Sequence, residues 1–285
     1  MIIVVDALNK DRFGDLLDQM FQLRARVFGD RLGWEVTITN GREIDQFDHL
    51  DPAYVIGLDD DGTVVSCVRA LQTTGPHMLS DVFQVLLDGE PPLRSATLWE
   101  STRFCVDTQR LAGDGTMKAV SWATCELMIG SLEYARRSGI SDIITVIDPV
   151  VNRVLKRSDN APYDYVGSTK QMGKVPAMAA LLDCTEERIN RVRAFANIHH
   201  DVFAEDDTVR ALLDRKAQIA EQIAAEMAAE AEEEIRVTAE EIRDYCSDLL
   251  QSARTEKERA DAQRLVDMLV RQRIHPTMPV LVHSR

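Results

Sequence analysis

Two charged residues lie within a stretch whose other residues favour a buried β-strand. Residues 97–106 are rich in Thr, Trp, Phe and Val, which suit extended backbone, yet they include Glu100 and Arg103. Because burying an unpaired charge is costly, the two are expected either to carry out chemistry or to be paired. A carboxylate can accept a proton there, and a guanidinium can bind a substrate carboxylate through two hydrogen bonds. The alternative, that Glu100 and Arg103 pair only for structure, stays open at this point.

The geometry of the strand decides which of these side chains face each other. Alternation predicts Glu100 and Thr102 on one face and Arg103 on the other, unless a β-bulge intervenes. Residues 111–116, with the sequence Leu-Ala-Gly-Asp-Gly-Thr, follow the strand and precede a long apolar helix pattern. A strand, a glycine-containing loop and a helix start leave backbone N–H groups pointing outward, which predicts an anion cradle suited to a thioester-handling enzyme.

Hydrophobic periodicity predicts the elements that position these residues. Glycine and proline breaks separate them, and residues 39–51 are expected to form an ordered segment that covers the substrate. The predicted helices are 13–29, 78–87, 117–137, a short one beginning at Pro149, and 185–199, and the predicted strands are 54–58, 64–71, 97–106, 142–148, 163–166 and 175–182. This order predicts an α/β (α+β) fold with a mixed central sheet and helices on its faces.

Composition excludes several classes of function. A net charge of −14 argues against nucleic acid as a partner. Five cysteines without a Cys-x-x-Cys pair indicate reduced thiols in a cytoplasmic protein, and six histidines without ligand spacing predict no metal site. No run is apolar enough for a membrane span, and the first residues resemble a strand more than a secretory signal.

The last part of the chain differs in composition. Residues 1–200 carry 21 basic and 28 acidic side chains, and residues 201–285 carry 12 and 19, so the shorter part has the higher density of negative charge. This change predicts a domain at 1–203 and a helical extension at 204–285. A stripe from Val209 to Met227 predicts a first helix, and the patterns Thr238-x-x-Glu241 and Thr255-x-x-Glu258 predict the starts of a second and a third.

Several short motifs together resemble a known family. Their order and spacing are similar to those of the acyl-homoserine-lactone synthases of bacterial quorum sensing, over about residues 1–195. The motifs are Arg24, Phe28 and Trp34; Asp45 and Asp48; Cys67-Val-Arg69; Thr73-Thr-Gly-Pro76 with Met78-Leu79; and Glu100-Ser-Thr-Arg-Phe104.

The resemblance implies a fold and a reaction. The fold would be a three-layer sandwich related to the Gcn5-type N-acetyltransferases (GNAT). The amine of S-adenosylmethionine would be acylated by a thioester, and the product would close to a lactone with release of methylthioadenosine. No resident cofactor is expected, because S-adenosylmethionine is a substrate and the acyl donor carries its own phosphopantetheine.

The chemistry of this reaction gives roles to Glu100 and Arg103. Glu100, the only carboxylate in the predicted buried strand, would accept the amine proton, and Arg103 would pair with it or hold the substrate carboxylate. The resemblance implies roles for further residues. Thr102 and Thr145 would contact the third carbon of the acyl chain, although threonine is also simply a good strand residue. The pocket for S-adenosylmethionine would be built by Arg24, Phe28, Trp34, Asp45, Asp48, Arg69 and Phe104.

The sequence leaves more than one interpretation of how the acyl donor binds and of what the extension does. Arg153, Lys156 and Arg157 cluster in an otherwise acidic chain and would dock an acyl carrier protein or coenzyme A, or only complement a helix C-terminus. The extension either mediates homodimerisation or partner binding, or is a solvated appendage. For the whole chain, the alternatives to lactone synthesis are an N-acyltransferase acting on another amine and a non-catalytic binding platform.

Overall fold

The computed structural model describes residues 1–113 and 117–273, with side chains except at 112–120, 232–240, 242, 243 and 269–273. The chain forms two compact units, 1–216 and 217–285. The strands are β1 (Ile2–Val5), β2 (Ile38–Thr39), β3 (Arg42–Glu43), β4 (Ala53–Leu58), β5 (Val64–Gln72), β6 (Leu98–Val106), β7 (Asp142–Ile147), β8 (Asp164–Met172) and β9 (Val175–Asp183). The helices are α1 (Gly14–Arg24), α2 (Met78–Asp81), α3 (Thr108–Gly113), α4 (Met117–Arg137), α5 (Pro149–Arg157), α6 (Glu186–Ala196), α7 (Asp206–Ser252) and α8 (Glu256–Arg273), with short helical turns η1 (Lys10–Arg12), η2 (Ala25–Arg31), η3 (Gln46–Leu50) and η4 (Gln84–Leu87).

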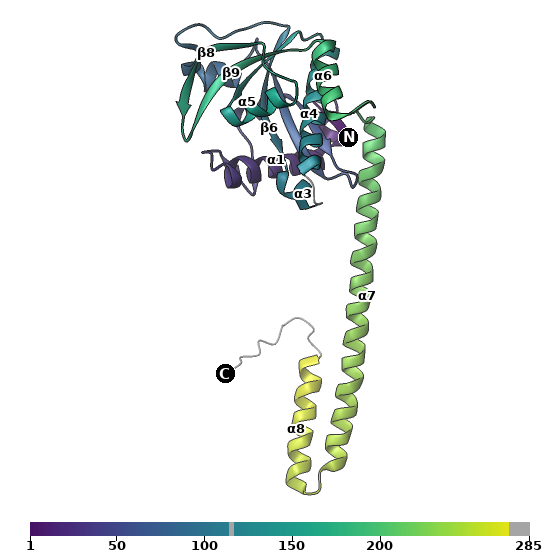
Figure 1. Cartoon of the computed structure of the whole chain (residues 1–285). Coiled ribbons are helices and arrows are strands. Elements are labelled where there is room, and N and C mark those ends of the chain that lie inside the picture. Colours follow the sequence, from purple (N-terminus) through teal and green to yellow (C-terminus); the bar gives the residue numbers. More distant parts are fainter. Residues whose placement is uncertain (114–116, 274–285) are drawn as a thin grey trace. The chain divides into compact units, whose positions relative to one another are not determined.

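A seven-stranded sheet organises the first unit (Figure 1). Its order is β1-β4-β5-β6-β7-β9-β8, and every neighbouring pair is antiparallel except β6 and β7. The parallel pairing runs from Leu98 opposite Asp142 to Ser101 opposite Thr145, and then ends. Beyond that point β6 continues along β5 and β7 continues along β9. The sheet is therefore mixed, and its one parallel pair separates in the middle.

Helices cover both faces of this sheet. On one face, α4 and α6 pack with Ile143 and Ile147 in a large apolar cluster. On the other face, α1 packs with Ile56 and Cys67, and the segment of α2 and η4 packs with Ile144. Because consecutive strand residues point to opposite faces, these clusters form the two interfaces of a three-layer sandwich. The predicted GNAT-like architecture is confirmed.

A β-bulge interrupts β6, so the placement of Arg103 on the face opposite Glu100 and Thr102, which alternation predicted, is wrong. Cys67 lies opposite Cys105 and Arg69 lies opposite Thr102, so Arg103 and Phe104 together face Val68. Arg103 has φ of +57°, a left-handed conformation that is strained for a residue with a side chain. The bulge turns Arg103 toward the face that carries Thr102, which simple alternation would not allow.

Some predicted elements end or begin elsewhere. The helix expected at 13–29 ends at Arg24 and continues as the wider π-helical turns of η2. The loop expected before α4 is partly wrong, because residues 108–113 form α3 directly after β6. The rest of the predicted anion cradle, residues 114–116, lies outside the described residues. The predicted helix 117–137 matches α4.

Among the described residues the extension consists of α7 and α8, within the two or three helices that the apolar stripe and the capping patterns predicted. α7 runs through Thr238 without a break, so the helix start predicted there is wrong. The start predicted at Thr255 is confirmed, since the Thr255 hydroxyl accepts from the Glu258 N–H and the Glu258 carboxylate accepts from the Thr255 N–H. The first unit ends at Lys216, further along than the boundary predicted at 203, because Val209 is fully buried against the core below α1.

Candidate active site

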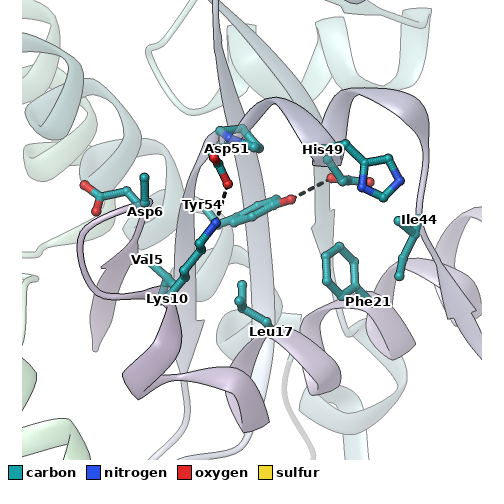
Figure 2. Close-up of a pocket in the computed structure, with 12 residues that line it drawn as sticks. Val5, Asp6, Lys10, Leu17, Phe21, Ile44, His49, Asp51 and Tyr54 are labelled. Atoms are coloured by element: carbon teal, nitrogen blue, oxygen red, sulfur yellow. Dashed lines mark hydrogen bonds and ion pairs between the residues drawn. The ribbon is translucent and has the colours of Figure 1, made fainter.

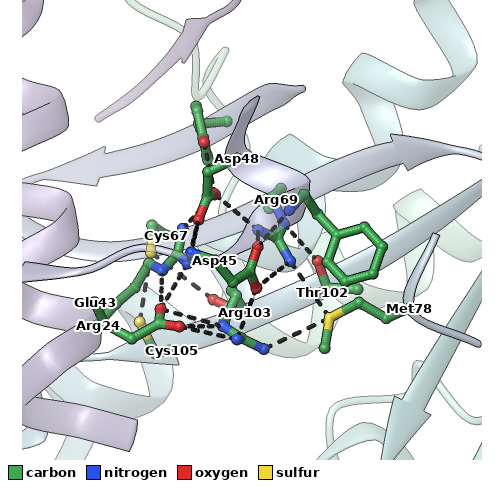
Figure 3. A network of polar contacts seen from close by, with 12 residues as sticks. Arg24, Glu43, Asp45, Asp48, Cys67, Arg69, Met78, Thr102, Arg103 and Cys105 are labelled. Carbon is green, nitrogen blue, oxygen red and sulfur yellow. Dashed lines mark hydrogen bonds and ion pairs between the residues drawn. The ribbon is translucent and has the colours of Figure 1, made fainter. Parts of the chain in front are cut away.

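Arg24 is the innermost cation of a polar network between α1 and the sheet (Figure 3). It lies at the end of α1 and is fully buried. Its Nε donates to Glu43 Oε2 at 2.6 Å, and its two Nη groups donate to the two oxygens of Asp48 at 2.8 Å each. A fork of this kind fixes both the position and the plane of the Asp48 carboxylate.

Arg69 forms the second node of the network. It lies on β5, fully buried, and donates to both oxygens of Asp45 at 2.6 and 2.9 Å. It also donates to Asp48 Oδ1 at 2.7 Å and to the Thr102 hydroxyl at 3.0 Å. The two aspartates are themselves held in place, because they form a reciprocal capping box at the start of η3. The segment 39–51 is therefore ordered.

Arg103 forms the third node, at the bulge. Its Nη2 lies 2.9 Å from Glu43 Oε1 and 2.7 Å from Asp45 Oδ2. Its Nη1 reaches only the sulfur of Met78, at 3.5 Å, a weak acceptor, among the contacts of the described residues. Arg103 therefore pairs with Glu43 and Asp45 and not with Glu100.

The charges in this network balance. Three guanidinium groups, Arg24, Arg69 and Arg103, face three carboxylates, those of Glu43, Asp45 and Asp48. Burial alone would raise the pKa of Asp48, but the hydrogen bond and charge of Arg24, together with Arg69, hold that pKa below its usual value. Burial and the neighbouring Asp48 charge raise the pKa of Tyr54, whose hydroxyl donates to Asp48 Oδ1 at 2.7 Å. The Asp48 carboxylate is thus ionised near neutral pH.

Glu100 is held separately from the arginines. Its carboxylate is fully buried and accepts the N–H groups of Met78 and Leu79 at 2.6 Å each. Burial raises its pKa from 4.5 to about 7, although both N–H bonds and the charge of Arg69 oppose this. Met78 connects Glu100 with the arginine network, because its backbone N–H donates to Glu100 and its sulfur contacts Arg69 and Arg103. A carboxylate with a pKa near 7 can both accept and release a proton at neutral pH.

Two predicted aromatic residues lie beside Arg103. The rings of Phe28 and Trp34 are 5.1 Å apart, and the Arg103 guanidinium lies 5.5 Å from the centre of the Phe28 ring. Phe28 is buried, while 38% of Trp34 is exposed. The pair therefore forms an aromatic wall that reaches from the network to the surface.

The other residues predicted for the site lie on β6, β7 and α5. Phe104 packs against the cluster under α4, on the opposite face of the sheet from the arginines. Thr102 contacts Arg69, and the Thr145 hydroxyl donates to the Ser101 carbonyl at 2.9 Å, where β6 and β7 separate. Because Ile143 and Ile147 belong to the α4 face, Thr145 lies on that face and Thr102 on the other. Arg153, Lys156 and Arg157 are all exposed on α5.

Two open spaces lie near these residues. One cavity, of about 240 Å³, is lined by Asp48, a member of the arginine network, and by Tyr54 (Figure 2). Lys10 and Asp51, which pair with each other, also line it. The other, of about 300 Å³, lies between α5 and β8 and includes Lys156 and Tyr165. Within residues 1–113 and 117–273, no three His, Cys, Asp or Glu side chains come together as ligands for a metal ion.

Sequence reasoning missed Glu43, the buried acid that joins Arg24 to Arg103. A signal was present. If Glu100 serves catalysis, only Asp45 and Asp48 remain to neutralise the three predicted arginines, and Glu43 precedes those acids in the same segment. It also missed Tyr54 and the sulfur contacts of Met78, for which the sequence carries no comparable signal.

The fold and the site define the class of protein. A mixed sheet whose parallel pair separates beside a buried carboxylate is the arrangement of a GNAT-like acyltransferase. Residues 9–192 match the family model described as autoinducer synthase. The chain therefore belongs to the autoinducer synthase family, the acyltransferases that make acyl-homoserine-lactone signals for quorum sensing.

Named relatives agree with this assignment. The chain is 36% identical over 191 residues to the acyl-homoserine-lactone synthase of Agrobacterium fabrum, covering 67% of this chain and 90% of that protein. It is 35% identical over 194 residues to the synthase of Rhizobium etli, covering 68% and 88%. Among solved structures, the CoA-dependent acyl-homoserine lactone synthase MesI is 28% identical with a TM-score of 0.62, covering 72% of this chain and all of that one. LasI is also 28% identical, with a TM-score of 0.59, covering 70% and 98%. The predicted family, fold and class of activity are confirmed.

Among the helices of the described residues, none combines the length and the apolar character that a membrane span requires.

Proposed function

We propose that this chain joins S-adenosylmethionine to an acyl thioester, with Glu100 as the proton acceptor. The amine nitrogen attacks the thioester carbonyl, a C–N bond forms, the C–S bond breaks, and the thiol leaves with a proton. The substrate carboxylate then attacks its own γ-carbon, a C–O bond forms, and methylthioadenosine leaves as the C–S bond to the sulfonium breaks. The observation that carries the proposal is the buried Glu100 carboxylate, held by two backbone N–H groups beside an arginine cluster.

Arg103 supports the orientation that ring closure needs. Its Nη2 is held by Glu43 and Asp45, while Nη1 contacts only the Met78 sulfur among the described residues. A substrate carboxylate is a far better acceptor than a thioether, so we assign Nη1 to that carboxylate. Holding the carboxylate in line with the γ-carbon lowers the barrier to closure by reducing the entropy lost in the reaction.

The aromatic wall suits the sulfonium end of the substrate. Phe28 and Trp34 offer ring faces next to Arg103, and a cation is attracted to such faces. Asp45 and Asp48 lie on the same side, where Arg24 and Arg69 neutralise and fix their carboxylates. Phe104 packs on the opposite face, so we assign it to support of the strand.

The two threonines support a role at the third acyl carbon. The Thr102 oxygen accepts from Arg69, which leaves its O–H free to donate to a 3-oxo group. The Thr145 hydroxyl donates to Ser101, which leaves its oxygen free to accept from a 3-hydroxy group. They lie on opposite faces where β6 and β7 separate, so we propose that the acyl chain passes through that gap.

The function is tested by incubating purified protein with S-adenosylmethionine and a set of acyl thioesters. We expect an acyl-homoserine lactone and methylthioadenosine in equal amounts, measured by mass spectrometry. Acylated adenosylmethionine without lactone would confine the activity to the first step. Acylation of other amines at equal rates would contradict the assigned substrate.

For the acyl donor, we propose an acidic acyl carrier protein docked on α5, with acyl-CoA as the competing donor. The basic side chains Arg153, Lys156 and Arg157 are exposed there, and Val150 and Val154 on the same helix are 56% and 38% exposed. Exposed apolar groups beside basic ones match an acidic protein surface better than a small anion. The relative MesI is described as CoA-dependent, which keeps acyl-CoA as a donor to be compared.

Replacing Arg153, Lys156 and Arg157 with alanine is expected to raise the KM for acyl carrier protein, because the attraction between opposite charges is lost. The salt dependence of that KM should also weaken, while the KM for S-adenosylmethionine stays unchanged. The measurement is initial rate against donor concentration at two ionic strengths. A control replaces Arg191, a partly exposed basic residue on α6, with alanine. Unchanged donor kinetics in the triple variant would refute docking at α5.

For the extension, we propose homodimerisation through the exposed stripe on α7. Ile219, Ile223 and Met227 are about half exposed or more and recur every fourth residue. A stripe of this kind on an acidic helix is typical of a surface that binds another helix.

Replacing Ile219, Ile223 and Met227 with glutamine in the full chain is expected to convert dimers to monomers, since the apolar contact is lost. Light scattering after size exclusion measures the mass per particle. The control, Glu221→Gln, changes the opposite side of the same helix. A wild-type chain that is already monomeric would refute the proposal.

A further inference from the structure

Cys67 and Cys105 form an isolated pair of thiols beside the arginine network (Figure 3). They lie directly opposite each other on the antiparallel strands β5 and β6, and their sulfur atoms are 3.4 Å apart. Both are almost fully buried, at 1% and 3% exposure. Opposed residues in an antiparallel pair have Cα atoms roughly 4.5–5.5 Å apart, which is within the range that a disulfide accepts.

This pair directly adjoins the bulge that orients Arg103. Cys105 is the first paired residue after the bulge, and Cys67 is its partner across the strands. The sulfur of Cys67 also lies 3.8 Å from the Arg103 carbonyl oxygen. No step of the reaction above uses either thiol, and neither side chain contributes to the ion pairs of the network.

We infer that Cys67 and Cys105 are a modification site that a peroxide converts to a cross-strand disulfide, with reversible loss of activity. One thiol attacks hydrogen peroxide, an S–O bond forms, the O–O bond breaks, and water leaves. The second thiol attacks the resulting sulfenic sulfur, an S–S bond forms, the S–O bond breaks, and a second water leaves. Two thiols are oxidised, and one peroxide is reduced to two waters.

The new bond changes the geometry at the bulge. A disulfide has its sulfur atoms about 2.05 Å apart, so the pair must close by more than an ångström from its 3.4 Å contact. To close that distance the Cys67 sulfur turns toward Cys105 and gives up its contact with the Arg103 carbonyl oxygen, which lies 3.8 Å from it, so Arg103 is expected to shift at the bulge. An error of about 1 Å in a catalytic group costs on the order of a hundredfold in rate, and we expect a loss of that size.

Burial makes this reaction slow. Burial and the neighbouring Cys67 raise the pKa of Cys105, while the charges of Arg24 and Arg31 oppose the shift. The thiolate is the reactive form, so oxidation should speed up as the pH rises. Once one sulfur is oxidised, the second is already in contact with it, and the disulfide should form before further oxidation.

The test is to treat the full chain with hydrogen peroxide, block free thiols, and map the peptides by mass spectrometry while following activity. We expect a Cys67–Cys105 linked peptide that appears in step with the loss of lactone formation, and recovery of both with dithiothreitol. The peptide map can be read whether or not the protein forms lactone. A linked pair without lactone formation in the untreated protein would therefore count against the proposed function alone.

The variants Cys67→Ala and Cys105→Ala should retain activity in peroxide, whereas the control Cys184→Ala, another buried cysteine, should lose it like the wild type. Should either of the first two fail to fold, the wild-type peptide map still decides. Loss of activity without the linked peptide, or the linked peptide with full activity, would overturn the inference.

Discussion

Glu100→Gln is expected to lower the kcat of lactone formation by about 10²- to 10⁴-fold, the usual contribution of general acid–base catalysis. The amide keeps the shape of the side chain, but it cannot take the amine proton. Binding of S-adenosylmethionine should stay within a few fold of the wild type, because Glu100 does not pair with the arginines that surround the substrate site. Rates and titration calorimetry with purified protein measure the two effects.

The pH profile separates this role from a structural one. Because the pKa of Glu100 is raised to about 7, wild-type kcat should rise with pH through that value as the carboxylate ionises. The variant should lack this inflection. Glu126→Gln, in which another buried carboxylate is changed on α4, is the matched control and should leave the inflection in place. A Glu100→Gln variant with an unchanged profile would remove Glu100 from the mechanism.

The raised pKa of Glu100 also makes the free energy of unfolding depend on pH. Between pH 4.5 and about 7 an unfolded Glu100 is ionised, while the folded protein still holds its proton. The folded state binds more protons there, so the contribution of Glu100 to the free energy of unfolding falls as the pH rises through this window and is constant above it. Glu100→Gln should remove this part of the pH dependence.

Asp48→Asn is expected to lower the free energy of unfolding by about 3–5 kcal/mol, the usual effect of breaking a buried ion pair from one side. Asp48 receives hydrogen bonds from Arg24, Arg69 and Tyr54, so the variant leaves two buried guanidinium groups without full compensation. Chemical denaturation measures the loss. Weaker binding of S-adenosylmethionine should accompany it, because Arg24 and Arg69 no longer hold the same positions.

The matched control is Asp51→Asn, three residues along the same segment. Asp51 pairs with Lys10, but both side chains are largely exposed, so its loss should lower the free energy of unfolding far less than the loss of Asp48. The pKa of Asp48 is held below its usual value, so its stabilising effect is complete above the unfolded pKa of a carboxylate and is lost as the pH falls through the folded one. Equal losses in the two variants would show that the network is not a stabilising unit.

Much of the fold could be predicted from local patterns. The Met117–Arg137 helix and the Asp142–Ile147 strand follow from hydrophobic periodicity and length, which act within each segment. The Thr238 helix start was wrong because a capping pattern only permits a helix to begin. The residues on both sides of Thr238 are good helix formers, and the helix continues through them.

By itself, the sequence singled out the residues that we propose carry the chemistry. Glu100 and Arg103 stand out because charged residues are rare in a strand of this composition, and the spacing of the arginines and aspartates was enough to identify the family. Those signals depend on residue type and order along the chain, which need no coordinates.

The tertiary structure decided how these residues pair. The bulge at Arg103 places it on the face with Thr102, gives it Glu43 and Asp45 as partners in place of Glu100, and leaves Phe104 on the other face. Whether a strand bulges depends on how two strands align with each other, and the partners of a buried charge depend on which segments fold over it. Both are settled by contacts between residues far apart in the chain, so no local pattern could have specified them.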